Sequence, residues 1–507
     1  MTAREARGHG ARHVLTRTVP GILTVALLAA PFVAAWQYDA HRRSVSAQAP
    51  APAGGALPGV RPAAARHTAA PVVLAYHDVT PDSDSRYAVT PEQLDAHLGA
   101  LRAAGYRALS SAEFTRYLTT GRAPAPRTVY LTFDDGTRGL WAYADPILAK
   151  HRMRAATYLI TGMVGTRRPY YLTWAEIGRL AASGRWDFQA HTHDGHRRAA
   201  VDAAGRRGSV LANRLWLPEK ERLETPGEYR DRVGRDLDRA ARAFAAHSLP
   251  APRLFAYPFS ETGRASNLPG GGTPVLERLL RERFTATLTN TAARPLPAGA
   301  RAAATGQVQR LGMVADTTPE ALLREVRDRT SLAPGDAPEP LREPGHWTFP
   351  DGQRGALGAV TGLGSARRTY VSAAHRPFAT ADWGTYRVTA RADGLGAAGT
   401  SVSVQVGYGS RHPGTLTVSG RGLRFVQRPD GGPPEVAVRE LAPAVERELT
   451  LRVTPRSVRI TVDGTTLDVA RPEGVPVALM SGGIALGVRN EDPQRAWPRF
   501  TSLRISP

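Results

Sequence analysis

From Pro71 to about Leu332, short apolar runs of strand length alternate with segments of helical periodicity. This alternation is typical of a parallel α/β fold, in which a helix returns the chain between successive strands. The expected strands are Val72–Tyr76, Thr128–Phe133, Ala155–Ile160, Asp187–His191, Arg253–Pro258 and Phe284–Thr289. Because 507 residues exceed what one core usually organises, we expect further domains outside this range.

Local signals also predict helices between these strands. Thr90 suits the cap of a helix that starts at Pro91, since proline is tolerated at the first helical position. A long polar excursion from Arg197 to Ala246 separates the fourth strand from the fifth. We expect this excursion to be rich in helix and to flank the functional site.

The pattern changes after residues 333–344, a linker rich in proline, glycine and glutamate. Residues 345–507 alternate apolar and polar positions with a period of two, and Asp463-Gly464 is a hairpin signal. These features predict a β-sandwich of jelly-roll type. Its role stays open between carbohydrate binding and packing, because its aromatic residues suit either use. They are Trp347, Trp383, Tyr386, Tyr408 and Phe425.

The N-terminal part, residues 1–46, predicts export. An uncharged stretch from Thr18 to Tyr38 is about long enough to cross a bilayer, with four arginines before it and two shortly after it. This asymmetry favours a cytoplasmic tail and a single-pass signal anchor, with the folded part outside the cell membrane. The alternative is a secreted protein, because Ala47-Gln48-Ala49 fits a signal-peptide cleavage site. A Pro/Ala-rich linker spans residues 47–70.

Composition excludes some chemistry. The chain has no cysteine, so it has no disulfide, thiolate metal site or cysteine nucleophile. The net charge of +21 comes from arginines scattered over all segments, which indicates compositional bias, and we expect no nucleic-acid partner.

Two clusters of polar residues follow expected strands of the first domain. Asp134-Asp135-Gly136 comes directly after Phe133, and His191, His193 and His196 follow the strand that begins at Asp187. In α/β barrels the carboxyl ends of parallel strands share one face, which is where catalytic groups lie. Two imidazoles and one carboxylate, with positions left open, form a site of the catalytic zinc type. Alone, either cluster would suit an ordinary solvated turn.

The ordered motifs resemble the metal-dependent polysaccharide deacetylases, carbohydrate esterase family 4, also called the NodB homology domain. Thr132–Gly136 is similar to the first motif of that family, His191–His196 to the second and Phe255–Phe259 to the third. Leu74–Val79 and the five-residue step between His191 and His196 are most similar to the subgroup that deacetylates poly-β-1,6-N-acetylglucosamine. The resemblance covers residues 71–332 and implies a deformed (β/α) barrel.

The resemblance also implies roles for individual residues. Asp135, His191 and His196 would bind a divalent metal, with zinc expected first and cobalt or nickel as alternatives. Asp134 would be the general base, and the backbone amide of Phe259 would donate to the oxyanion, because Pro258 has no N–H.

The sequence departs from the family pattern at two points. A late Leu-x-His motif usually supplies the general acid, yet no histidine lies between His247 and His346. His77, at the end of the first strand, is therefore our candidate for the general acid, with Asp78 as an orienting neighbour. The arginine that usually orients the base is replaced by Ala256, and Arg253 is a weak candidate for its role.

The sequence therefore predicts an exported, metal-dependent enzyme that removes acetyl groups from an N-acetylglucosamine polymer. Poly-β-1,6-N-acetylglucosamine is the first choice of substrate, and a peptidoglycan or chitin deacetylase is the alternative. An inactive glycan-binding protein is an alternative of another class. It is disfavoured because the candidate base and all the candidate metal-binding residues are present.

Overall fold

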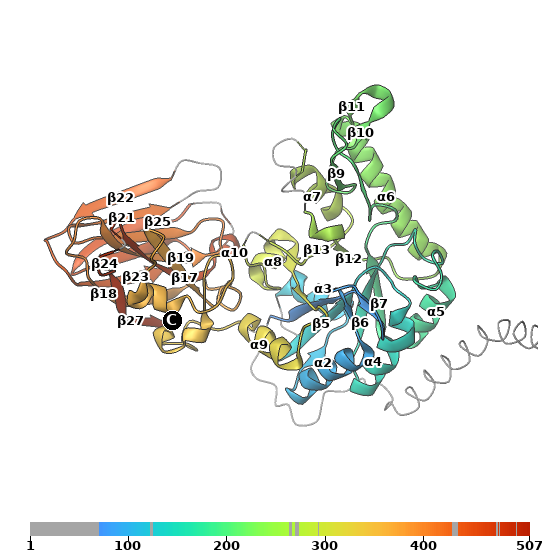
Figure 1. Cartoon of the computed structure of the whole chain (residues 1–507), viewed down its shortest axis with the longest axis horizontal. Coiled ribbons are helices and arrows are strands. Elements are labelled where there is room, and N and C mark those ends of the chain that lie inside the picture. The colour runs from blue at the N-terminus through green and yellow to red at the C-terminus, as the bar shows by residue number, and fades with distance from the viewer. Residues whose placement is uncertain are drawn as a thin grey trace, which may run out of the picture.

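The computed structural model describes residues 70–507 except 122–124, 263–265, 269–272, 293, 428–433, 473–474, 476 and 493. The predicted N-terminal anchor therefore lies outside the described residues. Among those residues, no helix combines the length and apolarity needed to span a bilayer. Two units lie side by side in Figure 1, an α/β unit and an all-β unit.

The α/β unit is built on one parallel sheet that nearly closes into a barrel. Its strands follow the order β14-β13-β12-β7-β6-β5-β1-β15. They are β1 (Val72–Tyr76), β5 (Thr128–Phe133), β6 (Ala155–Leu159), β7 (Trp186–Ala190), β12 (Leu254–Ala256), β13 (Ala286–Thr289), β14 (Gln307–Gln309) and β15 (Leu311–Gly312), with β4 (Arg107–Ala108) beside β5. The deformed (β/α) barrel is confirmed, and each expected strand is present.

The barrel closes through one bent segment. β14 pairs with β13 and β15 pairs with β1, and only Arg310 separates these two short strands in the chain. A single stretch of backbone therefore joins both edges of the sheet. The side chain at the bend is buried inside the barrel, since Arg310 is only 2% exposed.

Helices cover the outside of this sheet (Figure 1). They are α2 (Pro91–Ala103), α3 (Ser111–Thr120), α4 (Asp145–His151), α5 (Trp174–Ala182), α6 (Pro226–Ala246), α7 (Thr273–Arg281), α8 (Ala300–Thr305) and α9 (Pro319–Arg329). The predicted start of α2 is confirmed. The Thr90 side chain accepts from the Gln93 amide and the Gln93 side chain accepts from the Thr90 amide, which together form a capping box.

The expectation of a helix-rich excursion was only half right. Residues 226–246 form α6, but the chain before it forms two small hairpins, which project beyond the barrel with α6 (Figure 1). They are β8 (Arg198–Ala200) with β9 (Arg207–Ser209), and β10 (Trp216–Leu217) with β11 (Arg222–Leu223). Turn chemistry explains the difference. Asp202 accepts from the Arg206 amide, and Gly205 has a φ of 75°, so the chain reverses instead of continuing as a helix.

The second unit is an antiparallel β-sandwich, which confirms the predicted all-β domain. One sheet has the order β16-β17-β26-β19-β20-β21-β22 and the other β25-β24-β23-β18-β27. The first comprises β16 (Trp347–Thr348), β17 (Tyr370–His375), β26 (Gly483–Asn490), β19 (Thr400–Tyr408), β20 (Gly414–Val418), β21 (Gly422–Gln427) and β22 (Glu435–Glu440). The second comprises β25 (Thr465–Ala470), β24 (Ser457–Val462), β23 (Arg447–Val453), β18 (Tyr386–Asp393) and β27 (Arg499–Ser506).

The sandwich aromatics mostly belong to its core. Trp347, Trp383, Tyr386 and Phe425 are each 4% exposed or less, so their rings are not accessible for stacking on a sugar. Tyr408 is the one member of the predicted set that keeps partial exposure. Alternation along the strands explains the burial of Trp347, Tyr386 and Phe425, because their side chains point into the space between the two sheets. Trp383 lies just before β18 and packs in the same core.

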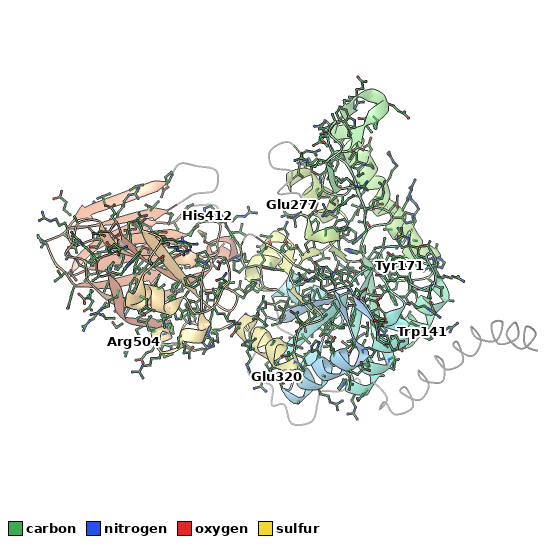
Figure 2. The ribbon with its side chains drawn as sticks, viewed as in Figure 1. Trp141, Tyr171, Glu277, Glu320, His412 and Arg504 are labelled. Carbon is green, nitrogen blue, oxygen red and sulfur yellow. The ribbon has the colours of Figure 1, made fainter. Side chains whose placement is uncertain are left out.

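A buried polar contact joins the two units. The Asp382 carboxylate of the sandwich accepts from the amides of Ala300 and Arg301 at the start of α8, at 3.0 and 3.2 Å. The buried Arg301 guanidinium donates to three sandwich carbonyls, those of Ala381, Gly409 and Ser481. Gly409 precedes the loop that carries His412, which Figure 2 labels on the part of the sandwich nearer the barrel. These hydrogen bonds hold α8 against the sandwich.

Candidate metal centre and active site

The predicted site residues come together at the carboxyl ends of the barrel strands. Asp134 and Asp135 follow β5, His191 follows β7, His77 follows β1 and Phe259 lies just beyond β12. In a parallel barrel these ends open on one face, so residues far apart in sequence meet there. The chain leaves β5 with Asp135 at a φ of 70°, and this sharp turn lets two consecutive carboxylates serve one site.

Asp135, His191 and His196 form a cluster whose ligand atoms all lie within 4.8 Å of one another. Asp135 Oδ1 lies 3.5 Å from the Nε2 atoms of both histidines. Ligands about 2.1 Å from a tetrahedral zinc ion are about 3.4 Å apart, so both spacings match edges of such a tetrahedron. Three protein ligands leave a fourth position for substrate or water.

The surroundings of the cluster fit a metal as well. Asp135 Oδ1 is buried and makes no hydrogen bond within the described part of the chain, which is costly for a carboxylate unless an ion satisfies it. The His191 Nδ1–H donates to the Ala256 carbonyl at 2.8 Å, which leaves the Nε2 lone pair facing the cluster. Burial and the nearby His191 lower the pKa of His196 to about 4, so its imidazole is neutral and able to ligate at neutral pH.

His193, the third histidine of the motif, is not part of the cluster. Its Nδ1 atom lies 2.9 Å from the Thr161 hydroxyl. The Asp236 carboxylate of α6 accepts from the amides of His193 and Asp194, at 3.1 and 2.7 Å. These bonds fix the loop between the two candidate ligands, so His193 supports the loop's position.

Arg310 holds Asp134, and the sequence reading missed it. Its Nη1 and Nη2 atoms donate to the two carboxylate oxygens of Asp134 at 2.7 and 2.6 Å, a bidentate pair with both side chains buried. The Arg310 Nε atom also donates to Asn290 Oδ1 at 2.8 Å. Burial opposes ionisation of Asp134, but the Arg310 guanidinium outweighs it and keeps the pKa of that carboxyl well below its usual range.

Neither residue considered from the sequence orients Asp134. Arg253 precedes β12 and therefore lies at the end of that strand away from the site. Ala256 contributes its carbonyl to His191 instead. The bend between two very short strands gave no periodic signal, so only the closed barrel reveals that Arg310 and Asp134 meet across 176 positions.

His77 lies beside the candidate base. Its Nε2 atom is 4.0 Å from Asp134 Oδ2, and its side chain is 22% exposed. Its Nδ1 atom is buried and has no hydrogen-bond partner among the described residues. Asp78 was expected to orient His77, yet the hydrogen bonds described for its carboxylate come from the Thr137 hydroxyl and the Val79 amide. Asp78 therefore fixes the turn after β5.

Three exposed aromatic side chains surround the cluster. Tyr87, Tyr170 and Phe259 are 50%, 49% and 41% exposed. The Tyr87 ring centroid lies 5.1 Å from that of His77, and the Phe259 ring lies 4.6 Å from that of His196. Burial together with the charges of Asp78 and Asp135 raises the pKa of Tyr170 to about 12, which indicates that its phenol is near the carboxylates. The site thus has an apolar, aromatic rim.

Residues 121–268 match the family model described as polysaccharide deacetylase. This segment of the chain is therefore similar to the polysaccharide deacetylases. A poly-β-1,6-N-acetyl-D-glucosamine N-deacetylase of Escherichia coli K12 is 26% identical over 205 residues, 38% of this chain and 30% of that protein. One from Staphylococcus epidermidis is 31% identical over 113 residues, 22% of this chain and 39% of that protein. The aligned parts thus span well under half of these curated relatives.

Two solved structures match about half of this chain and nearly all of their own length. IcaB from Ammonifex degensii is 26% identical, with 51% of this chain and 96% of that chain covered and a TM-score of 0.39. The BpsB deacetylase domain from Bordetella bronchiseptica is 23% identical, with 49% and 97% covered and a TM-score of 0.41.

Proposed function

We propose that this protein is a metal-dependent hydrolase that removes N-acetyl groups from an extracellular polymer of N-acetylglucosamine. The observation that carries the proposal is the cluster of Asp135, His191 and His196, with an ionised Asp134 fixed beside it. A divalent ion, zinc before cobalt or nickel, supplies Lewis acidity and lowers the pKa of water when bound to such a site.

The residues of the chain divide the remaining work. Asp134 is placed to take a proton from the water that attacks the acetamide carbon. His77 is placed to give a proton to the nitrogen as the carbon–nitrogen bond breaks, which releases acetate and leaves an amine on the sugar. The Phe259 amide is our candidate donor to the oxyanion, since Phe259 lies against His196.

The aromatic rim supports a sugar substrate. The exposed rings of Tyr87 and Tyr170, on two separate loops, offer apolar faces on which the C–H faces of pyranose rings pack well. The names of the aligned relatives make poly-β-1,6-N-acetylglucosamine the first polymer to test, with peptidoglycan and chitin as alternatives. We also propose that the enzyme acts outside the cell, either held by the N-terminal anchor or secreted. This part of the proposal rests on the sequence of residues 1–46.

The test is release of amine or acetate from poly-β-1,6-N-acetylglucosamine, chitin oligomers and peptidoglycan in parallel, with zinc, cobalt or nickel added after chelation. We expect activity to require metal. Asp134→Asn should retain metal and lose about two or more orders of magnitude in rate. Asp194→Asn is the matched control, because this exposed carboxylate lies on the same loop as His196 but outside the cluster.

The outcomes separate the alternatives. Activity on one polymer alone identifies the substrate, and near-normal turnover by Asp134→Asn assigns the base elsewhere. A protein that binds one of these glycans with metal present, yet releases no acetate from any of them, would be a glycan-binding protein. The thermal unfolding midpoint of Asp134→Asn is measured alongside, since its amide group faces the Arg310 guanidinium.

A further inference from the structure

A groove lies between the β8–β9 hairpin and the loop that follows Phe259. It encloses about 600 Å³, within the range of about 300–1,000 Å³ that ligand sites occupy. One wall is the hairpin, with Arg198 and Arg207, and another is the loop after β12, with Ser260 and Glu261. Ser260 follows Phe259, whose ring contacts His196, so a chain whose reacting unit sits at the cluster can extend into this groove.

The groove carries an excess of positive charge. The charged residues that line its described part are Arg198, Arg206, Arg207 and Glu261. Arg198 pairs with Glu261 and covers the Phe259 ring, with its guanidinium carbon 4.6 Å from the ring centroid. Arg206 pairs with Asp202 at 3.1 Å. Arg207 has no carboxylate within ion-pair distance among the described residues, and its Nη2 atom donates to the Arg198 carbonyl at 2.6 Å.

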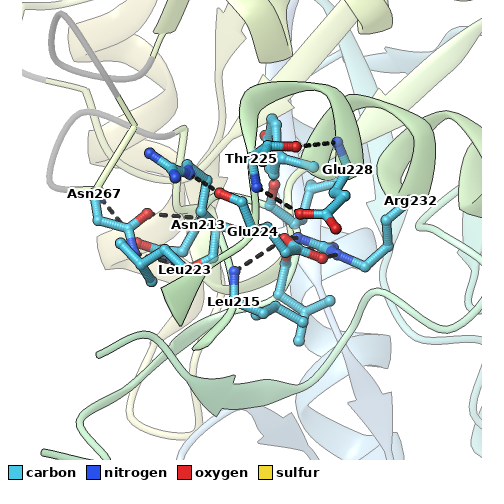
Figure 3. Close-up of polar contacts among 12 residues, drawn as sticks. Asn213, Leu215, Leu223, Glu224, Thr225, Glu228, Arg232 and Asn267 are labelled. Atoms are coloured by element: carbon cyan, nitrogen blue, oxygen red, sulfur yellow. Dashed lines mark hydrogen bonds and ion pairs between the residues drawn. The ribbon is translucent and has the colours of Figure 1, made fainter. Parts of the chain in front are cut away.

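The chain that follows the β8–β9 hairpin is held by polar contacts around Asn213, Glu224 and Asn267 (Figure 3). The Asn267 side-chain amide donates to the carbonyls of Val201 and Arg214, at 3.0 and 2.9 Å. Arg232 of α6 donates to the Asn213 carbonyl and to the buried Glu224 carboxylate, each at 2.9 Å. A backbone fixed in this way needs little ordering when a ligand binds.

We infer that this groove selects acetylated neighbours of the reacting sugar and disfavours neighbours that have already lost their acetyl group. The inference rests on the proposed function. An N-acetylglucosamine unit is neutral and offers an amide oxygen to a guanidinium, whereas a glucosamine unit carries an ammonium group at neutral pH. The unpaired Arg207 attracts the first and repels the second. The product of each turnover therefore slows the next reaction beside it, and the amines are dispersed along the polymer.

The experiment uses β-1,6-linked pentamers of N-acetylglucosamine. One is fully acetylated. Each of the other two carries one glucosamine next to the central unit, on its reducing side in one isomer and on its non-reducing side in the other. For the wild type we expect kcat/KM at the central unit to be about fivefold lower in the isomer whose amine enters the groove. This factor corresponds to two like charges about 7 Å apart in an effective dielectric constant of about 50. Added salt should reduce the ratio.

Arg207→Gln should bring this ratio close to one. Arg424→Gln is the matched control, because it removes the same charge from an exposed position on β21 of the sandwich. Equal kcat/KM values for all pentamers in the wild type, or a ratio unchanged by Arg207→Gln, would overturn the inference and leave the proposed function intact. Failure to hydrolyse the fully acetylated pentamer and the polymers would instead overturn the proposed function itself.

Discussion

Replacing Arg310 by methionine removes the positive partner of a carboxylate that is 2% exposed. Breaking a buried ion pair in this way costs about 3–5 kcal/mol, because the remaining charge is left uncompensated. We expect a loss of that size in the free energy of unfolding, measured by urea denaturation at pH 7 with chelator present so that metal binding adds no stability. The double variant Arg310→Met/Asp134→Leu should lose less than the sum of its single changes.

The pH dependence gives an independent measure of the same contact. The folded-state pKa of Asp134 is lowered, so its stabilisation is present above the unfolded pKa of about 3.9 and is lost as the pH falls below it. Without Arg310, burial raises that pKa instead. The difference in stability between variant and wild type should therefore narrow as the pH falls, when the buried carboxyl of the variant becomes neutral.

Measurements of activity distinguish a role of Arg310 in positioning Asp134 from a role in folding alone. Arg310→Met should keep its metal, lose about a hundredfold or more in kcat, and show the acid limb of its pH profile at higher pH. Arg253→Met is the matched control, because it removes an arginine at the other end of the barrel. Stability within about 1 kcal/mol of the wild type, together with an unchanged pH profile, would refute the role assigned to Arg310.

Three further predictions test the rest of the site and the domain contact. Asp135→Ala, His191→Ala and His196→Ala should each lose the metal by elemental analysis, and full occupancy in all three folded variants would rule out the cluster. His77→Ala should keep the metal and lose most turnover on the acetamide, with a smaller loss on an activated acetyl ester that needs no proton on its leaving group. Equal losses on both substrates would show that His77 is not the acid. Asp382→Ala should lower the free energy of unfolding by about 1 kcal/mol, the usual value of a helix cap, and an unchanged thermal midpoint would exclude that contribution.

Sequence reasoning worked where one rule connects local pattern to position. The strands were recognisable because each is a buried apolar run between helices, and the rule that parallel strands deliver their ends to one face then brought Asp134, His191 and His77 together. The same rule said nothing of Arg310. Its strands are two and three residues long, and a lone arginine between them looks like any exposed arginine in a chain that has many.

Other features could not be read because they depend on tertiary contacts. The hairpins before α6 are too short to show a period, and the path of the first one depends on the turn at Asp202 and Gly205. Asp78 looked like a partner for His77 because the two are adjacent in sequence. In the structure its carboxylate instead accepts a hydrogen bond from the Thr137 hydroxyl at 2.6 Å, a contact across the sheet that spacing does not encode.

The contact between the two domains bears on the same residue that positions the base. Asp382 caps α8, and Arg301 in α8 is buried against sandwich carbonyls. Only Gly306 separates α8 from β14, and Arg310 is the next residue after that strand. The segment that docks the sandwich is thus continuous with the segment that closes the barrel and holds Asp134. A substitution that loosens this interface should therefore displace Asp134 more than His191. The reason is that His191 is held separately, by the Ala256 carbonyl of β12.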